Sequence, residues 1–357
     1  MLTPKGWNMK NLLPALLAGS MLLCGCGRTP RRDLVPVALP PHPAENAVTL
    51  RRTEQLRKFL APMKVRAAVF FPTAFFPHAV TADAEVLTSL KKCGFNRVYC
   101  HITSEQELDD RLRAFLAAAA QAGLPVEIAI SQIDFYRRYR ANQLIRWALI
   151  QYPDLFRAAE LVTEFNQSLP KEHRIAGITV YVAPHIYNGQ NVWRMYNQLY
   201  RWADTRYGKG GDNDMLMREA LDILRRIAAI PDLPPLTVAF PDFYHDRAVA
   251  GDLSVGAVKD FAAISPSLMI INTANLPSQM ARNLEKELND APPAARIIAE
   301  VPLAHHSSIS TGRLRRRNWD DFMRALEAFK TVSAKDDNFD GMALSPLAVI
   351  EYLRQEK

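Results

Sequence analysis

Short apolar runs alternate with amphipathic segments along most of the chain, and the alternation repeats eight times. The runs are too short for helices and are rich in Val, Ile, Leu and Phe, which is typical of strands buried on both faces. The predicted strands are Val65–Phe71, Arg97–Ile102, Val126–Ile130, Gly177–Val182, Leu236–Phe240, Leu268–Asn272, Arg296–Val301 and Gly341–Leu344.

The segments around these runs repeat their apolar residues every three or four positions, which predicts helices. One lies ahead of the first strand at about 50–59. The others are Ala82–Lys92, Ser104–Ala122 with a capping box of Ser104 and Glu107, about 142–168 with an interruption near Pro153, Val192–Tyr207, Asp214–Ala229, Ser254–Ala263, Ser278–Asn289, Asn318–Val332 and Leu347–Arg354.

Eight consecutive strand–helix units require a parallel sheet covered by helices, and eight parallel strands can close on themselves. We therefore predict a (β/α)8 TIM barrel as one domain over residues 49–357. The competing fold is an open, doubly wound sheet that binds a nucleotide. Such a sheet needs a Gly-x-Gly-x-x-Gly turn after its first strand, but residues 71–77 read Phe-Pro-Thr-Ala-Phe-Phe-Pro, and the chain has no Walker sequence.

The N-terminus has the pattern of an export signal. Lys5 and Lys10 precede an apolar run of about a dozen residues that ends in small residues, which predicts a signal peptide over residues 1–25. The sequence Leu23-Cys24-Gly25-Cys26 resembles the lipobox of bacterial lipoproteins, which implies that Cys26 is lipidated. The alternative is a plain secretory signal with incidental cysteines.

Residues 26–48 are rich in proline and without periodicity, which predicts a flexible tether. With the lipidated Cys26, it places the protein in the cell envelope, anchored to a membrane outside the cytoplasm as a periplasmic or outer-membrane lipoprotein.

Composition and charge add three expectations. The chain has 357 residues, 48% of them hydrophobic and 23% charged, which is typical of a folded globular protein. It carries 44 Lys and Arg against 37 Asp and Glu, but two of these lysines leave with the signal peptide. The remaining basic residues form small clusters scattered along the chain, so no nucleic-acid partner is expected. Cys93 ends a predicted helix and Cys100 the next strand, which predicts two buried free thiols and no disulfide.

Chemistry in such barrels lies at the carboxyl ends of the strands. The polar and aromatic residues expected there are Thr73, His78, His101, Ser131, Gln132, Asp134, Tyr181, His185, Asp242, Tyr244, His245, Asn272, Asn275, Glu300, His305, His306 and Ser345. Amides and carboxylates hydrogen-bond hydroxyl groups and rings stack on sugar faces, so this set suits a carbohydrate ligand. Trp193 after the fourth strand is a further candidate for stacking.

No metal and no cofactor are expected. The adjacent His305 and His306 would point in opposite directions from an extended segment, so at most one of them faces a given site. A zinc site needs three or more convergent ligands.

Two segments resemble a known group of proteins. Residues 175–185, Ile-Ala-Gly-Ile-Thr-Val-Tyr-Val-Ala-Pro-His, are similar to the fourth strand of secreted glycoside-hydrolase-like TIM barrels, which reads Gly-Ile-His-Leu-Asp-Val-Glu-Pro-His. Residues 297–301 and 339–345 look like the seventh strand of the same proteins, which ends in Glu, and their eighth strand. The resemblance implies a carbohydrate-active barrel.

The departures from this pattern concern the catalytic carboxylates. Retaining glycosidases of the related families take the acid/base from strand four and the nucleophile from strand seven. Glu300 matches the second position, but Tyr181 stands where the family has Asp and Ala183 where it has Glu. The resemblance therefore implies that the two-carboxylate mechanism cannot run on these positions.

Three interpretations remain open. In the first, which we prefer, the barrel binds carbohydrate with degenerate catalytic machinery, and its ligand contacts are Glu300, Asp242, Tyr181, His185, His101, Gln132, Tyr244, Asn272 and Trp193. In the second, the protein is an active glycoside hydrolase in which Glu300 works with Asp134 or Asp242. In the third, it is a non-catalytic envelope protein whose barrel mouth docks a protein partner.

Overall fold

The computed structural model describes most of the barrel and not the N-terminal segment. The described residues are 46–70, 84–102, 105–131, 152–182, 212–272, 277–301, 319–333, 336–345, 349 and 352–353. The predicted signal peptide and nearly all of the predicted tether lie outside them, together with Cys26.

Eight parallel strands form a closed barrel in the order β1 to β8, with β8 pairing back onto β1. The strands are β1 Val65–Phe70, β2 Arg97–His101, β3 Val126–Ser131, β4 Gly177–Tyr181, β5 Leu236–Pro241, β6 Ser267–Ile271, β7 Arg296–Val301 and β8 Phe339–Leu344. The (β/α)8 prediction is therefore confirmed, and the open sheet is excluded because every described strand has two neighbours.

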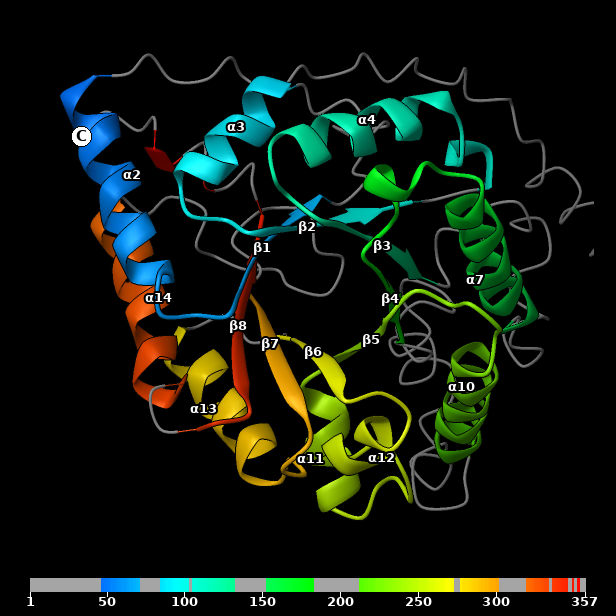
Figure 1. Cartoon of the computed structure of the whole chain (residues 1–357). Helices are drawn as coiled ribbons and strands as arrows, with labels where there is room; N and C mark the ends of the chain where they lie inside the picture. Colours follow the sequence, from blue (N-terminus) through cyan, green and yellow to red (C-terminus); the bar gives the residue numbers. More distant parts are fainter. Residues whose placement is uncertain are drawn as a thin grey trace, which may run out of the picture.

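Helices surround the strands in Figure 1. They are α2 Ala47–Leu60, α3 Ala84–Lys92, α4 Asp110–Gln121, α7 Tyr152–Gln167, α10 Asp212–Ala228, α11 Phe243–Val249, α12 Val258–Ala262, α13 Pro277–Asn289 and α14 Trp319–Ser333. Short 3-10 segments, η3 Glu105–Glu107 and η5 Lys171–His173, precede α4 and β4. Helix α2 comes before the first strand and completes the ring beside α14, where the Trp319 Nε1 donates to the Gln55 side chain at 2.7 Å.

One predicted helix start differs from the structure, and one helix was not predicted. Helix α4 begins at Asp110 and is capped by the Asp109 carboxylate, which accepts from two backbone N–H groups, so the expected capping box at Ser104 and Glu107 is wrong. Helix α7 begins at Tyr152, close to the predicted interruption at Pro153, and the predicted helical residues before it, 142–151, lie outside the described part of the chain. Pro153 is in the first turn of α7, where proline is well tolerated. Helix α11 was missed because its seven residues are too few to show a helical period.

Two apolar cores stabilise the fold. The larger core fills the space between the strands and the surrounding helices. The smaller core fills the barrel lumen with inward-facing side chains, among them Val69, Tyr99, Tyr181 and Met269. Cys93 and Cys100 are buried free thiols in the larger core, as predicted.

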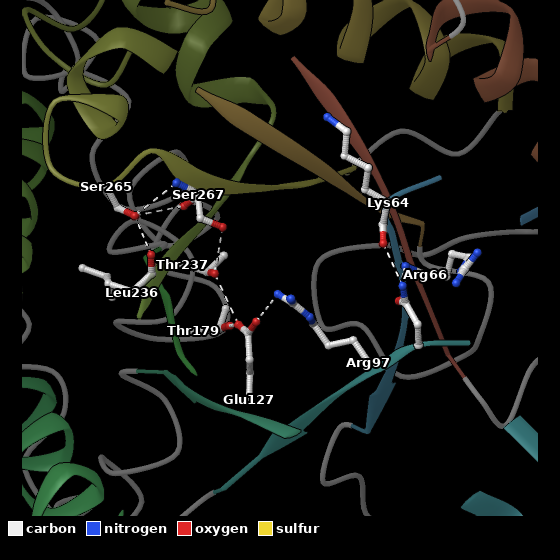
Figure 2. Close-up of polar contacts among 10 residues, drawn as sticks. Lys64, Arg66, Arg97, Glu127, Thr179, Leu236, Thr237, Ser265 and Ser267 are labelled. Atoms are coloured by element: carbon white, nitrogen blue, oxygen red, sulfur yellow. Dashed lines mark hydrogen bonds and ion pairs between the residues drawn. The ribbon is translucent and has the colours of Figure 1, made fainter. Parts of the chain in front are cut away.

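A polar cluster occupies the amino-terminal half of the lumen (Figure 2). The Glu127 carboxylate forms an ion pair with Arg97 and accepts hydrogen bonds from the hydroxyls of Thr179 at 3.1 Å and Thr237 at 3.3 Å. A Cβ at Gly177 would lie 2.9 Å from the Glu127 side chain, so a glycine is required beside this carboxylate. Burial raises the pKa of Glu127, and the Arg97 guanidinium opposes that shift.

Among the described residues, no helix has the length and apolar character that crossing a membrane requires.

Candidate functional site at the carboxyl end of the barrel

Three predicted site residues meet inside the carboxyl end of the lumen. Tyr181 is the last residue of β4, His101 is the last residue of β2, and Glu300 is the fifth of six residues in β7. The Tyr181 hydroxyl donates a hydrogen bond to Glu300 Oε2 at 3.0 Å and lies 3.4 Å from the Met269 sulfur. The His101 ring contacts the Tyr181 ring edge to face, with centroids 5.6 Å apart.

Strand periodicity explains why these side chains converge. Successive side chains of a strand point to opposite faces, so Ile298 and Glu300 of β7 share the inward face. In the same way, Tyr99 and His101 share the inward face of β2. The lumen is thus apolar at its middle and polar near both ends.

Glu300 has a strongly perturbed acidity. Its side chain is buried, and desolvation raises its pKa to about 7, against the opposing effects of the Tyr181 hydroxyl and the His101 imidazole. A carboxyl group with this pKa exists in both protonation states at neutral pH. It can therefore either donate a proton to a ligand oxygen or accept one from a ligand hydroxyl.

The last two residues of all eight described strands include one acidic residue, which is Glu300. A partner carboxylate for catalysis would therefore have to come from a residue that follows a strand. Asp242 and Asp134 were the sequence candidates for this role.

Asn272 supports the Glu300 backbone. It directly follows β6, is fully buried, and donates to the Glu300 carbonyl from its backbone N–H at 3.3 Å and from its side-chain Nδ2 at 3.0 Å. The structure assigns no hydrogen-bond partner to its Oδ1 among the described residues. Asn272 thus fixes the backbone of β7 at the residue that carries the carboxyl group.

Asp242 is directed toward the helix ring. It follows β5, is buried, and its Oδ2 accepts from the Asn283 side chain of α13 at 2.7 Å. Two residues later, Tyr244 lies in α11 and is buried in the core between strands and helices. Asp242 therefore links the end of β5 to α13, and Tyr244 packs between the strands and the helices.

A second cluster of ionisable groups lies between α11 and α13. Glu287 is buried, and neither of its carboxyl oxygens has a hydrogen-bond partner in the described structure. Burial, followed by the nearby Asp242 carboxylate, raises the pKa of Glu287 to about 9, so this group is neutral at pH 7. Burial lowers the pKa of His245, whose Nε2 lies 3.2 Å from Asp290.

Ten candidate residues of the sequence analysis lie outside the described part of the chain: Cys26, Thr73, His78, Gln132, Asp134, His185, Trp193, Asn275, His305 and His306. Within the described part, no group of three or more His, Cys, Asp or Glu side chains is arranged to hold a metal ion.

Two features escaped the sequence analysis. The Arg97–Glu127 pair was missed, although charged residues inside otherwise apolar strands were a visible signal of a polar lumen. The Glu287 cluster was missed because α11 was not predicted, so nothing indicated that its polar residues face α13.

Comparison with known proteins gives distant structural likeness alone. No protein-family model and no curated protein matches the sequence. Similar solved structures include a GH18 chitinase from Pseudoalteromonas aurantia, with 12% identity, a TM-score of 0.44, and coverage of 80% of this chain and 97% of that chain. An intracellular xylanase from Thermoanaerobacterium saccharolyticum gives 9% identity and a TM-score of 0.44, over 82% and 88% of the two chains.

Xylanase 10B from Thermotoga maritima gives 12% identity and a TM-score of 0.40, over 81% of this chain and 85% of that chain. Likeness at this level assigns no activity to this chain. The barrel fold itself is established by the order and pairing of its own strands.

Proposed function

We propose that the protein is a carbohydrate-binding (β/α)8 barrel that lacks two-carboxylate hydrolysis and is held in the cell envelope by a lipid on Cys26. The ligand enters at the carboxyl end of the barrel. Glu300, Tyr181 and His101 form the floor of the binding site, and residues that follow the strands complete it.

The hydrogen bond between Tyr181 and Glu300 is the observation that carries this proposal. A retaining glycosidase needs two carboxyl groups about 5–5.5 Å apart. In the barrel families that this sequence resembles, one of the two comes from strand four. Here the terminal inward residue of β4 is a phenol whose oxygen lies 3.0 Å from Glu300 Oε2. A phenol this close holds one oxygen of the carboxyl group, and at neutral pH it is a poor proton donor to a leaving oxygen.

The residue types of the floor suit a sugar. A carboxyl group that is partly protonated at neutral pH both donates to and accepts from ligand hydroxyls, and the His101 and Tyr181 rings offer an aromatic wall. The similarity of residues 175–185 and 297–301 to strands of secreted glycoside-hydrolase-like barrels favours the same ligand class.

One observation favours a second function, an active glycoside hydrolase. A pKa of about 7 suits a general acid or base at neutral pH, and Glu300 has this value. In that case Asp134 or Asp242 would supply the second carboxylate. Asp242 would have to leave Asn283 to do so.

Binding is tested by calorimetric titration with soluble oligosaccharides of glucose, xylose and N-acetylglucosamine in both anomeric linkages. We expect one class to bind, and Glu300→Ala to weaken its binding at least tenfold, which corresponds to the loss of about 1.4 kcal/mol. The matched control is Glu287→Gln, which changes a buried glutamate outside the lumen and should bind like the wild type. Equal binding by Glu300→Ala and the wild type would refute the site.

The anchor is tested separately by mass spectrometry of the N-terminal peptide from the membrane fraction. Lipidation at Cys26 predicts an acylated peptide that begins at that residue. Cys26→Ser should abolish acylation, whereas Cys24→Ser should leave it unchanged. Acylation that survives Cys26→Ser would contradict the anchor.

A further inference from the structure

We propose that the first turn of helix α2 docks onto an anionic membrane surface. This inference rests on the lipid anchor of the proposed function and adds a second, direct contact between the folded barrel and the bilayer. The contact surface consists of Val48 and Leu50 in this turn and of Arg51, which directly follows it.

Exposed aliphatic side chains are concentrated at this place. Three large apolar side chains stand exposed in the described part of the chain: Val48 at 44%, Leu50 at 53% and Val249 at 65%. Two of them lie in the first turn of α2. Leu56, Phe59 and Leu60 of the same helix pack in the core, so α2 is held against the barrel while Val48 and Leu50 stand exposed in its first turn.

The exposed side of α2 carries a positive charge. Arg51 is exposed next to the first turn. Arg57 and Lys58 are exposed in the last turn, where Glu54 forms ion pairs with Arg57 at 2.7 Å and Lys58 at 3.6 Å. A basic residue beside exposed aliphatic side chains, here Arg51 beside Val48 and Leu50, is typical of surfaces that contact anionic lipid headgroups. We infer a lipid surface rather than a protein partner because of what lies next to this turn in the sequence.

The helix begins directly after the segment that links it to Cys26. Nineteen residues, 27–45, separate Cys26 from Asn46, the residue that caps α2. Whatever its conformation, a segment of this length spans at most about 65 Å. A lipidated Cys26 therefore keeps α2 at a high effective concentration near the bilayer, where even a weak contact is populated. The three arginines of this segment, Arg28, Arg31 and Arg32, outnumber its two acidic residues, Asp33 and Glu45.

The direction of α2 gives the contact a functional consequence. Four residues, 61–64, join α2 to β1, so the helix runs back along the barrel and its first turn lies toward the carboxyl ends of the strands. Docking of this turn would bring the rim of the candidate sugar site close to the membrane.

The experiment uses the full chain, purified with its natural modification, and an environment-sensitive fluorophore on a single introduced cysteine. Val48→Cys places the probe on the proposed surface, and Val249→Cys is the matched control at an exposed aliphatic residue of α11. Cys93 and Cys100 are buried and burial raises both thiol pKa values to about 12, so they do not compete for the label.

Proteins are mixed with phosphatidylcholine vesicles that contain or lack phosphatidylglycerol. We expect a blue shift of emission at residue 48, not at 249, on anionic vesicles, and its loss in high salt, which screens surface charges. Arg51→Gln should lower the docking equilibrium constant about fivefold, the equivalent of about 1 kcal/mol per basic residue. Equal shifts at both positions, or no shift at 48, would overturn the proposal.

The lipid anchor on Cys26 and the docking of α2 would be refuted by different results. A chain without a lipid would not float with pure phosphatidylcholine vesicles, which would refute the anchor. The comparison of residues 48 and 249 on anionic vesicles would still decide whether α2 docks.

Discussion

Replacement of Tyr181 by Phe tests the central hydrogen bond of the site. The substitution removes the hydroxyl that donates to Glu300 Oε2 at 3.0 Å and keeps the ring that packs against His101. A hydrogen bond to a charged group contributes about 1.5–3 kcal/mol, and about 1.4 kcal/mol corresponds to one pH unit of acidity. The hydroxyl lowers the pKa of Glu300, so its loss should raise that pKa from about 7 to between about 8 and 9.

The pKa of Glu300 can be measured by carbon NMR of protein labelled at the glutamate carboxyl carbon. The resonance is assigned by its absence in Glu300→Gln. Tyr99→Phe is the matched control, because the Tyr99 phenol also faces the lumen but interacts with Arg97 and Glu127 at the other end. We expect the control to leave the pKa of Glu300 unchanged. A pKa that falls or stays near 7 in Tyr181→Phe would refute the reasoning.

Three further substitutions test other parts of the fold. The pKa of Glu287 is about 9 in the folded protein and near 4.5 in the unfolded chain. Because the folded state therefore holds this proton more tightly, the free energy of unfolding of the wild type should fall by about 1.4 kcal/mol per pH unit as the pH rises from about 5 to about 9. Urea unfolding of Glu287→Gln should lack this part of the pH dependence of the free energy of unfolding. Plots of that free energy against pH that run parallel for the wild type and the variant would contradict a neutral Glu287. Glu127→Ala should lower the free energy of unfolding by about 3 kcal/mol, because it leaves Arg97 and two threonine hydroxyls without their acceptor; denaturant midpoints equal to the wild type would be the contrary result. Gly341→Ala should destabilise the protein by about 3 kcal/mol or more in thermal unfolding, because the new Cβ would lie 1.7 Å from the Val65 carbonyl oxygen. The control is Gly251→Ala, whose Cβ meets no neighbouring atom and whose positive φ carries only a small cost of its own.

The fold was predictable because its signals are local. Each strand is a short apolar run bounded by turns or loops, and the number of such runs alone indicated a closed barrel. Helix starts were less predictable, because a carboxylate such as Asp109 competes with nearby Ser104 as the cap and the sequence does not show which of them the chain uses. Short helices such as α11 give too few turns for a period.

The site was predictable only in part, because a strand position shows where a side chain starts and not what it contacts. Glu300, Tyr181 and His101 come together because strand periodicity turns all three inward. Asp242 follows a strand in the same way, but it contacts Asn283 of α13 instead. That contact depends on helix packing between residues 41 positions apart, which no local pattern shows.

The most direct test of the account is release of reducing ends from the oligosaccharide that the protein binds, measured for the wild type and for Glu300→Gln under the conditions of the binding titration. We predict tight binding by the wild type and no release above background from either protein. Release by the wild type that Glu300→Gln abolishes would contradict the account and would establish Glu300 as a catalytic residue of an active hydrolase.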